Sequence, residues 1–134
     1  MILFAFGLAA LAAGEGSGQV AAKRVVMPSP NAEWKQVYAN DGRRAFVDSH
    51  NISLANGLVR YVGRLVFDRP VDNGGTTEIV HLGEINCAAH SYRTIAFDML
   101  GSNCALISSK DTPGEETPIG ANSPNDDLYK QYCR

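Results

Sequence analysis

Between Trp34 and Ile107 the sequence alternates short runs of β-branched and aromatic residues with compact turn signals. The clearest turns are Asn-Asp-Gly at 40–42, Asn-Gly at 56–57 and Asn-Gly-Gly at 73–75. Asn-Gly pairs favour the two-residue turn that joins neighbouring antiparallel strands. Short strands separated by such turns are typical of an antiparallel meander. This alternation constrains the fold more than any other feature of the chain.

The predicted elements follow from these turns and from the spacing of apolar residues. We expect strands over 34–38, 44–48, 52–54, 58–67, 76–87, 92–99 and 104–107. In the strand over 58–67, Tyr61 and Leu65 fall on one face and Arg60 and Arg64 on the other, a period of two. A helix of about nine residues should begin after Ser123, because serine suits an N-cap and Pro124 the first helical position. The predicted fold class is α+β, mainly β: a twisted antiparallel meander sheet with a C-terminal helix docked on it.

The N-terminus has the character of a secretory signal. Residues 1–13 carry no charge and are almost wholly apolar, and small residues follow them. We predict a signal peptide over residues 1–22, with cleavage after Ala13 or Ala22; the alternative is a buried N-terminal helix or strand. Residues 23–33 then form a linker and 34–134 the folded domain. The apolar run is shorter than the roughly 20 residues that cross a bilayer as a helix, so we expect no transmembrane segment. No cysteine near the cleavage sites offers a lipid attachment point, so we expect no lipid anchor.

The chain has three cysteines, and an exported domain is expected to oxidise them. If Cys87 ends one strand and a tight hairpin starts the next, Cys104 follows a turn about 25 Å away, at about 3.3 Å per residue. A disulfide needs Cα atoms about 4.4–6.8 Å apart, which disfavours that pair. We therefore predict Cys87–Cys133, which holds the terminal helix on the sheet, and a free thiol at Cys104. Cys104–Cys133 is the alternative.

Charge and motifs exclude several functions. Without residues 1–22, which contain one acid and no base, the chain carries 12 basic and 13 acidic residues. This balance does not favour nucleic acid, which selects a basic face. Cys87 and His90 lie three apart, with His81 and Cys104 nearby, but this is not the paired spacing of a zinc site. We predict no catalytic residue, no metal site and no cofactor.

Two sets of residues have simple structural interpretations. Glu84 is the one acid in an apolar strand, and alternation places it with Val80 and Leu82 on a face expected to be exposed. Seven aromatic residues suffice to fill a core of this size, and the alternative is that one or two of them belong to a binding face: Trp34, Tyr38, Phe46, Tyr61, Phe67, Tyr92 and Phe97.

Several segments of the chain resemble the surface-adhesin protein E-like family of Gram-negative envelope proteins. They are Trp34-Lys35-Gln36-Val37, Phe46-Val47-Asp48, Asn51-Ile52, the strand 59–67, Glu84-Ile85-Asn86-Cys87, Tyr92-Arg93, Pro118-Ile119 and Leu128-Tyr129-Lys130-Gln131-Tyr132-Cys133. The resemblance implies a twisted sheet with a helix tied back by a disulfide, and an envelope or surface location. It also implies binding to host extracellular-matrix and plasma proteins. The family's second tryptophan, before the Pro-Ile pair, is replaced here by Glu116-Thr117.

The sequence thus predicts a non-enzymatic exported protein of the periplasm or cell surface that binds a host matrix protein or another envelope protein. The alternatives are a periplasmic structural protein, an inhibitor of an exported enzyme that uses the loop 111–123, or a small periplasmic enzyme. The sequence does not set the oligomeric state.

Overall fold

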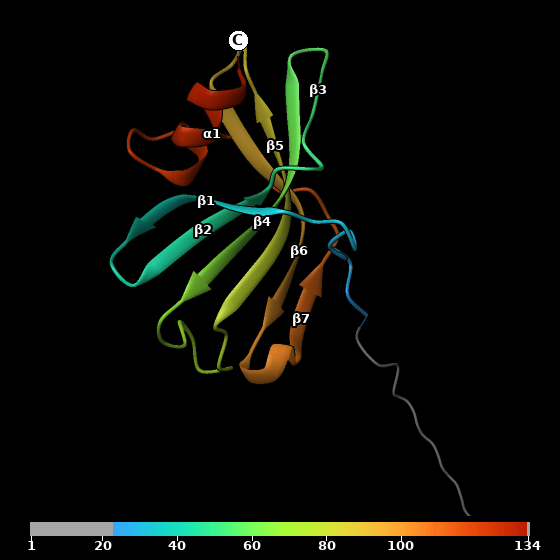
Figure 1. Ribbon diagram of the computed structural model, residues 1–134, viewed down its shortest axis with the longest axis vertical. Coiled ribbons are helices and arrows are strands. Elements are labelled where there is room, and N and C mark those ends of the chain that lie inside the picture. The colour runs from blue at the N-terminus through green and yellow to red at the C-terminus, as the bar shows by residue number, and fades with distance from the viewer. Residues whose placement is uncertain (1–22, 134) are drawn as a thin grey trace, which may run out of the picture.

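The computed structural model describes residues 23–133, so the predicted signal peptide over 1–22 lies outside the described residues. Within them the chain forms one curled antiparallel sheet with a single α-helix (Figure 1). The strands are β1 (Trp34–Asn40), β2 (Arg43–Asp48), β3 (Ser53–Ala55), β4 (Leu58–Phe67), β5 (Glu78–Asn86), β6 (Ser91–Leu100), β7 (Leu106–Lys110) and β8 (Thr117–Pro118). A 3₁₀ turn, η1 (Ser102–Cys104), precedes β7, and the helix is α1 (Pro124–Tyr132). The predicted fold class is confirmed.

The sheet is a meander in which six strands follow the order β1-β2-β4-β5-β6-β7. The short strands β3 and β8 pair with β4 and β6 and lengthen the sheet at one end. Asn56 and Gly57 both have positive φ, 55° and 75°, which is the backbone that a two-residue hairpin turn requires. They join Ala55 to Leu58, which are directly paired. The observed turn at Asn56-Gly57 and the start of β4 therefore agree with the sequence-based prediction.

The helix covers one end of one face of the sheet, called here the inner face (Figure 1). Leu128 of α1 and Ile119 pack there against three fully buried strand residues: Val47, Val59 and Ile85. Burial of one such aliphatic side chain contributes about 1.5–3 kcal/mol. A nine-residue helix is marginal alone in water, so this packing is what keeps α1 formed.

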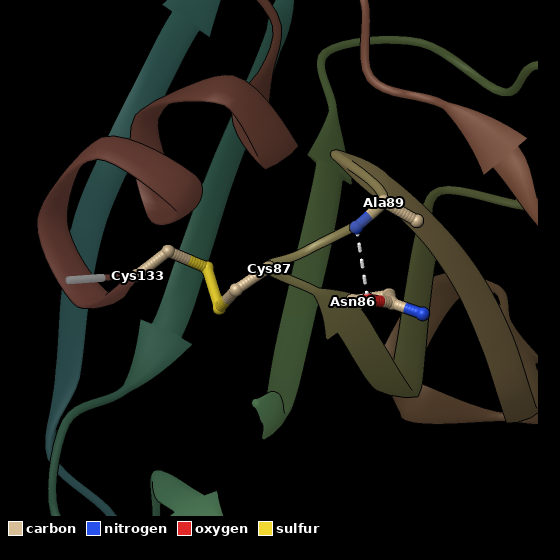
Figure 2. Close-up of a disulfide and its surroundings, with 4 residues drawn as sticks. All are labelled: Asn86, Cys87, Ala89 and Cys133. Atoms are coloured by element: carbon tan, nitrogen blue, oxygen red, sulfur yellow. Dashed lines mark hydrogen bonds between the residues drawn. A yellow bond between two sulfur atoms is a disulfide. The ribbon is translucent and has the colours of Figure 1, made fainter. Parts of the chain in front are cut away.

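Both ends of α1 are fixed. At the start, the Ser123 hydroxyl accepts a hydrogen bond from the backbone N–H of Asp126 at 3.2 Å, and Pro124 occupies the first turn. At the end, Cys133 forms the predicted disulfide with Cys87, with Cα atoms 5.5 Å apart (Figure 2). The tight turn after Cys87 is closed by the Ala89 N–H, which donates to the Asn86 side-chain oxygen at 3.1 Å.

The opposite, outer face has a second apolar cluster, formed with the N-terminal arm (residues 23–27). Val26 is 5% exposed and packs with Val80, Ala96 and Leu100. The segment expected as a linker thus begins with residues that lie against the sheet, because the outer face is apolar enough to need covering.

Asp98 of β6 fixes the arm in place. Its carboxylate is fully buried and accepts hydrogen bonds from the N–H groups of Val25 and Val26, from the Arg24 guanidinium and from the Ser109 hydroxyl. Burial alone would raise the pKa of Asp98, but these donors outweigh burial and hold the pKa below its usual value. The carboxylate therefore remains charged in the folded protein.

None of the helices in residues 23–133 is long and apolar enough to cross a membrane.

Candidate functional site

The end of the inner face that α1 leaves uncovered contains a cavity of about 500 Å³. This volume lies in the range of small-molecule sites, roughly 300–1,000 Å³. The register places Ala45, Leu65, Ile79 and Met99 side by side in one row across β2, β4, β5 and β6, and all four line the cavity. Its floor is therefore mainly apolar.

Two glycines give the floor its shape. Gly63 of β4 is paired with His81 of β5, and Gly83 of β5 is paired with Tyr61 of β4. A Cβ on Gly63 would lie 2.7 Å from Cε1 of His81, and a Cβ on Gly83 would lie 2.4 Å from Cζ of Tyr61. The outer end of each ring therefore occupies the space above the glycine of the neighbouring strand. The two rings meet edge to face, with centroids 5.7 Å apart.

Tyr61 lies at the helix end of the cavity, where Pro124, Asn125 and Leu128 of α1 also line it. Its hydroxyl donates to the side-chain oxygen of Asn125 at 2.7 Å, which links the sheet to the first turn of α1. The ring is 4% exposed, and burial raises the pKa of the phenol. The hydroxyl thus stays protonated and acts as a hydrogen-bond donor.

His81 is the polar group in the middle of the floor. Burial lowers the pKa of its imidazole to about 4, so the ring is neutral at physiological pH. Its Nδ1 is buried and has no hydrogen-bond partner within the part of the chain that the structure describes. An unpaired buried polar atom costs free energy, and a bound ligand is one way to satisfy it.

Arg43 supplies the charge of the cavity. It is exposed at the start of β2, one row beyond the apolar floor, and its guanidinium lies over the Tyr38 ring with the central carbon 5.7 Å from the ring centroid. No carboxylate of residues 23–133 forms an ion pair with it, whereas its neighbour Arg44 approaches Asp68 at 4.0 Å. Of the cavity-lining residues, Arg43 alone carries a formal charge at neutral pH. The cavity is therefore apolar with one cation at its edge.

Ion pairs on the outer face correct one sequence-based expectation. Glu84 is 4% exposed, not exposed, because it accepts hydrogen bonds from Arg60 at 2.8 Å and from Arg93 at 2.9 Å. Burial would raise the pKa of Glu84, but the two guanidinium groups lower it. Alternation found the correct face. It could not show that two arginines on neighbouring strands cover the carboxylate.

Further along the outer face, Arg64 lies between two aromatic rings. Its guanidinium carbon is 5.2 Å from the centroid of Trp34 and 5.7 Å from that of Phe46, and its Nε donates to Glu78 at 2.7 Å. We call Trp34, Phe46 and Arg64 the outer aromatic row. All three are half-buried.

The prediction that the aromatics fill the core is wrong for five of seven, because Tyr92 also packs against the buried cluster of Val47, Val59 and Ile85. Only Tyr61 is buried, while Trp34, Tyr38, Phe46, Phe67, Tyr92 and Phe97 stay partly exposed. For the inner-face aromatics the reason is geometric: α1 has nine residues, about 13 Å at 1.5 Å per residue, and cannot cover the whole inner face. Trp34 and Phe46 instead lie on the outer face, away from α1.

The structure does not bring the residues considered for zinc together. Cys87 is in the disulfide, His90 packs against the Tyr129 ring with centroids 4.2 Å apart, and His81 lies in the cavity. Cys104 is an exposed free thiol at the far end of the sheet. Among residues 23–133, no three His, Cys, Asp or Glu side chains gather as metal ligands.

The loop considered for an inhibitory role, 111–123, is tied to the sheet at several points. The N–H of Gly114 donates to the Thr94 carbonyl at 2.8 Å, and the N–H of Ile119 donates to the His90 carbonyl at 3.1 Å. Between them, Thr117 and Pro118 pair with β6 as β8. The loop is thus a part of the wall around the cavity.

A curled meander sheet with a disulfide-linked terminal helix is the architecture that the family resemblance implied. The chain matches the surface-adhesin protein E family over residues 34–134. It belongs to that family, which is one of surface adhesins. A search of curated proteins finds no match to this chain.

Proposed function

We propose that this chain is an exported, non-enzymatic binding module of the Gram-negative cell envelope that contacts host matrix proteins or other envelope proteins. The observation that carries the proposal is the family match, which extends over the entire segment from β1 to the end of α1. The Cys87–Cys133 disulfide supports it, because such bonds persist in oxidising compartments outside the cytoplasm.

The outer aromatic row is the surface best suited to a protein partner. Tryptophan and arginine are the residue types that most often dominate binding energy at interfaces. Here Trp34, Phe46 and Arg64 come from three adjacent strands, so their positions are fixed by the sheet before binding. A preformed contact loses little conformational entropy when the partner docks.

Capture experiments test this function. The oxidised protein is immobilised and exposed to a panel of purified extracellular-matrix proteins and to solubilised envelope proteins. We expect saturable binding of at least one purified protein, and a loss of tenfold or more in affinity for Arg64→Ala. The control is Arg69→Ala, the same change at an exposed arginine in the loop after β4, which should bind as the parent does. No binding to any panel member contradicts the proposal, and equal losses in the two variants place the contact elsewhere.

Export is tested separately. We propose that residues 1–22 are removed as a signal peptide, that 23–33 connect to the domain, and that the product carries no lipid. Expression in a Gram-negative host, followed by fractionation and N-terminal sequencing, should give a periplasmic or surface product that begins at residue 14 or 23. Retention of Met1 in a cytoplasmic product contradicts it.

A further inference from the structure

The cavity on the inner face carries an inference that goes beyond protein binding. Its apolar floor faces a space that α1, β8 and the other described elements do not fill. The row Ala45, Leu65, Ile79 and Met99 lies below His81 and Phe97, which are paired in the next row, and Tyr61 lies at the helix end. The cavity therefore has a helix end and an open end along the strands.

The dimensions select an elongated ligand. Arg43 is paired with Phe67 at the open end, and Tyr61 lies six residues back along β4. At about 3.3 Å per residue this separation is roughly 20 Å. An extended acyl chain of about a dozen carbons fits between them, and each of its methylenes would leave water for an apolar surface.

The charges select the head group. Arg43 is exposed at the open end and has no carboxylate partner within the described chain, while the lining residues contribute no negative charge. A guanidinium binds a carboxylate through paired hydrogen bonds. A ligand with an anionic end and an apolar tail would place each part against the matching surface.

We propose that the inner-face cavity binds an amphipathic carboxylate, a medium-chain fatty acid or a molecule with an equivalent acyl tail, with its head group on Arg43 and its tail along Leu65, Ile79, Met99 and Phe97. The tail ends near the His81 ring; an alkyl chain cannot hydrogen-bond to Nδ1 of that ring, so the assignment rests on the apolar floor and on Arg43. The side chains of Trp34 and Arg64 in the outer aromatic row lie on the other face of the sheet, and Phe46 is the one member of that row that also borders the cavity. The test of the cavity therefore does not depend on the proposed protein-binding function.

The direct test is titration of the purified oxidised protein with dodecanoate below its micelle concentration, followed by calorimetry and by amide and imidazole NMR signals. We expect one binding site per chain, with shifted signals confined to the inner face and including the His81 ring. Decanoate, two methylenes shorter, should bind about 15-fold more weakly at about 0.8 kcal/mol per methylene. Absence of binding, or shifts confined to the outer face, overturns the proposal.

The head-group assignment has a matched pair of variants. Arg43→Gln removes the cavity cation, while Arg44→Gln removes the same charge one residue later, on the opposite face of β2. We expect Arg43→Gln to weaken dodecanoate binding about tenfold and Arg44→Gln to leave it unchanged. Dodecanol, which has the tail but no charge, should bind both variants and the parent equally. Equal losses for dodecanoate in the two variants would show non-specific charge attraction and overturn the assignment.

Other occupants of the cavity give distinct results. If a second copy of the chain covers the inner face, the same NMR signals shift with protein concentration, sedimentation detects a dimer and dodecanoate does not dissociate it. That result overturns the proposal. A monomer that binds dodecanoate with the expected chain-length dependence supports it.

Discussion

The two ends of the inner face are built from the same strands, yet one is covered and the other is open. At the covered end, Leu128 of α1 packs over Val59 and Ile85, and the disulfide holds the helix in place. At the open end, Met99 and Phe97 remain half-buried around a cavity. The difference follows from the length of one short helix, and it separates the part that stabilises the fold from the part that can accept a ligand.

Removing the disulfide should have the largest effect, because it uncovers the closed end. The bond spans 46 residues, and the loop-length relation gives about 4 kcal/mol of stabilisation for a loop of this size. We expect Cys87→Ser/Cys133→Ser to lose about that amount in urea unfolding, with early loss of protection at α1 amides. Cys104→Ser is the control and should change stability by less than about 0.5 kcal/mol. Equal effects would show that the helix does not depend on the bond.

Truncation of one side chain at each end tests the comparison more directly. Leu128 is 2% exposed, so Leu128→Ala should cost about 3 kcal/mol through lost burial and a new cavity. Met99 already faces the open cavity, so Met99→Ala should cost less than about 1 kcal/mol. Urea denaturation of both variants measures the difference. A cost for Met99→Ala that matches Leu128→Ala would mean that the open end is packed as tightly as the covered one.

The free energy of unfolding should depend on pH because His81 lies at the open end of the inner face. The pKa of His81 is lowered by burial from 6.5 to about 4 in the folded protein, so between these values the unfolded chain binds the extra proton. Stability should therefore fall as pH drops from 6.5 to 4, by up to about 3 kcal/mol. Unfolding measured across this window in the parent and in His81→Gln isolates the contribution, since the variant lacks the group. An unchanged slope in the variant would exclude His81 as its source.

The two floor glycines provide the smallest and most local comparison. Gly83→Ala drives a methyl group into the Tyr61 ring, which is held by Asn125 under the helix, so we expect a cost of about 2 kcal/mol. Gly63→Ala pushes the His81 ring toward the open cavity and should cost about half as much. Thermal unfolding of the two variants measures this. A larger loss of stability for Gly63→Ala than for Gly83→Ala would show that the Tyr61 ring moves aside more easily than the His81 ring.

Local signals explain why much of the fold was predictable. The bounds of β4 and the N-cap at Ser123 agree with the sequence because Asn56-Gly57 and Ser123-Pro124 determine the backbone within a few residues. Strand length excluded the pair Cys87–Cys104 for a similar reason, whereas the choice between Cys87–Cys133 and Cys104–Cys133 depended on the fold. The turn, the N-cap and that exclusion depend on neighbours in the chain.

The cavity and the buried ion pairs depend on how the sheet curls, which no local pattern encodes. The aromatics were expected in the core because composition cannot show that α1 is too short to cover those on the inner face, or that Trp34 and Phe46 lie on the outer face. The placement of His81 over Gly63 requires the exact β4–β5 register, and the burial of Glu84 requires Arg60 and Arg93 from two different strands. The isolated cation at Arg43 could be suspected only once its neighbours were known.

The hydrogen bonds between Asp98 and residues 24–26 determine from which side an attached partner would reach this domain. Because residues 24–26 are fastened to the outer face, the chain enters the fold beside Ser109 of β7, whose hydroxyl also donates to the Lys23 carbonyl at 3.2 Å. A tether, tag or bead joined ahead of Lys23 would therefore reach the domain from the outer side of the β6–β7 edge. The inner face would be presented away from that attachment, with its orientation set by hydrogen bonds to a single carboxylate.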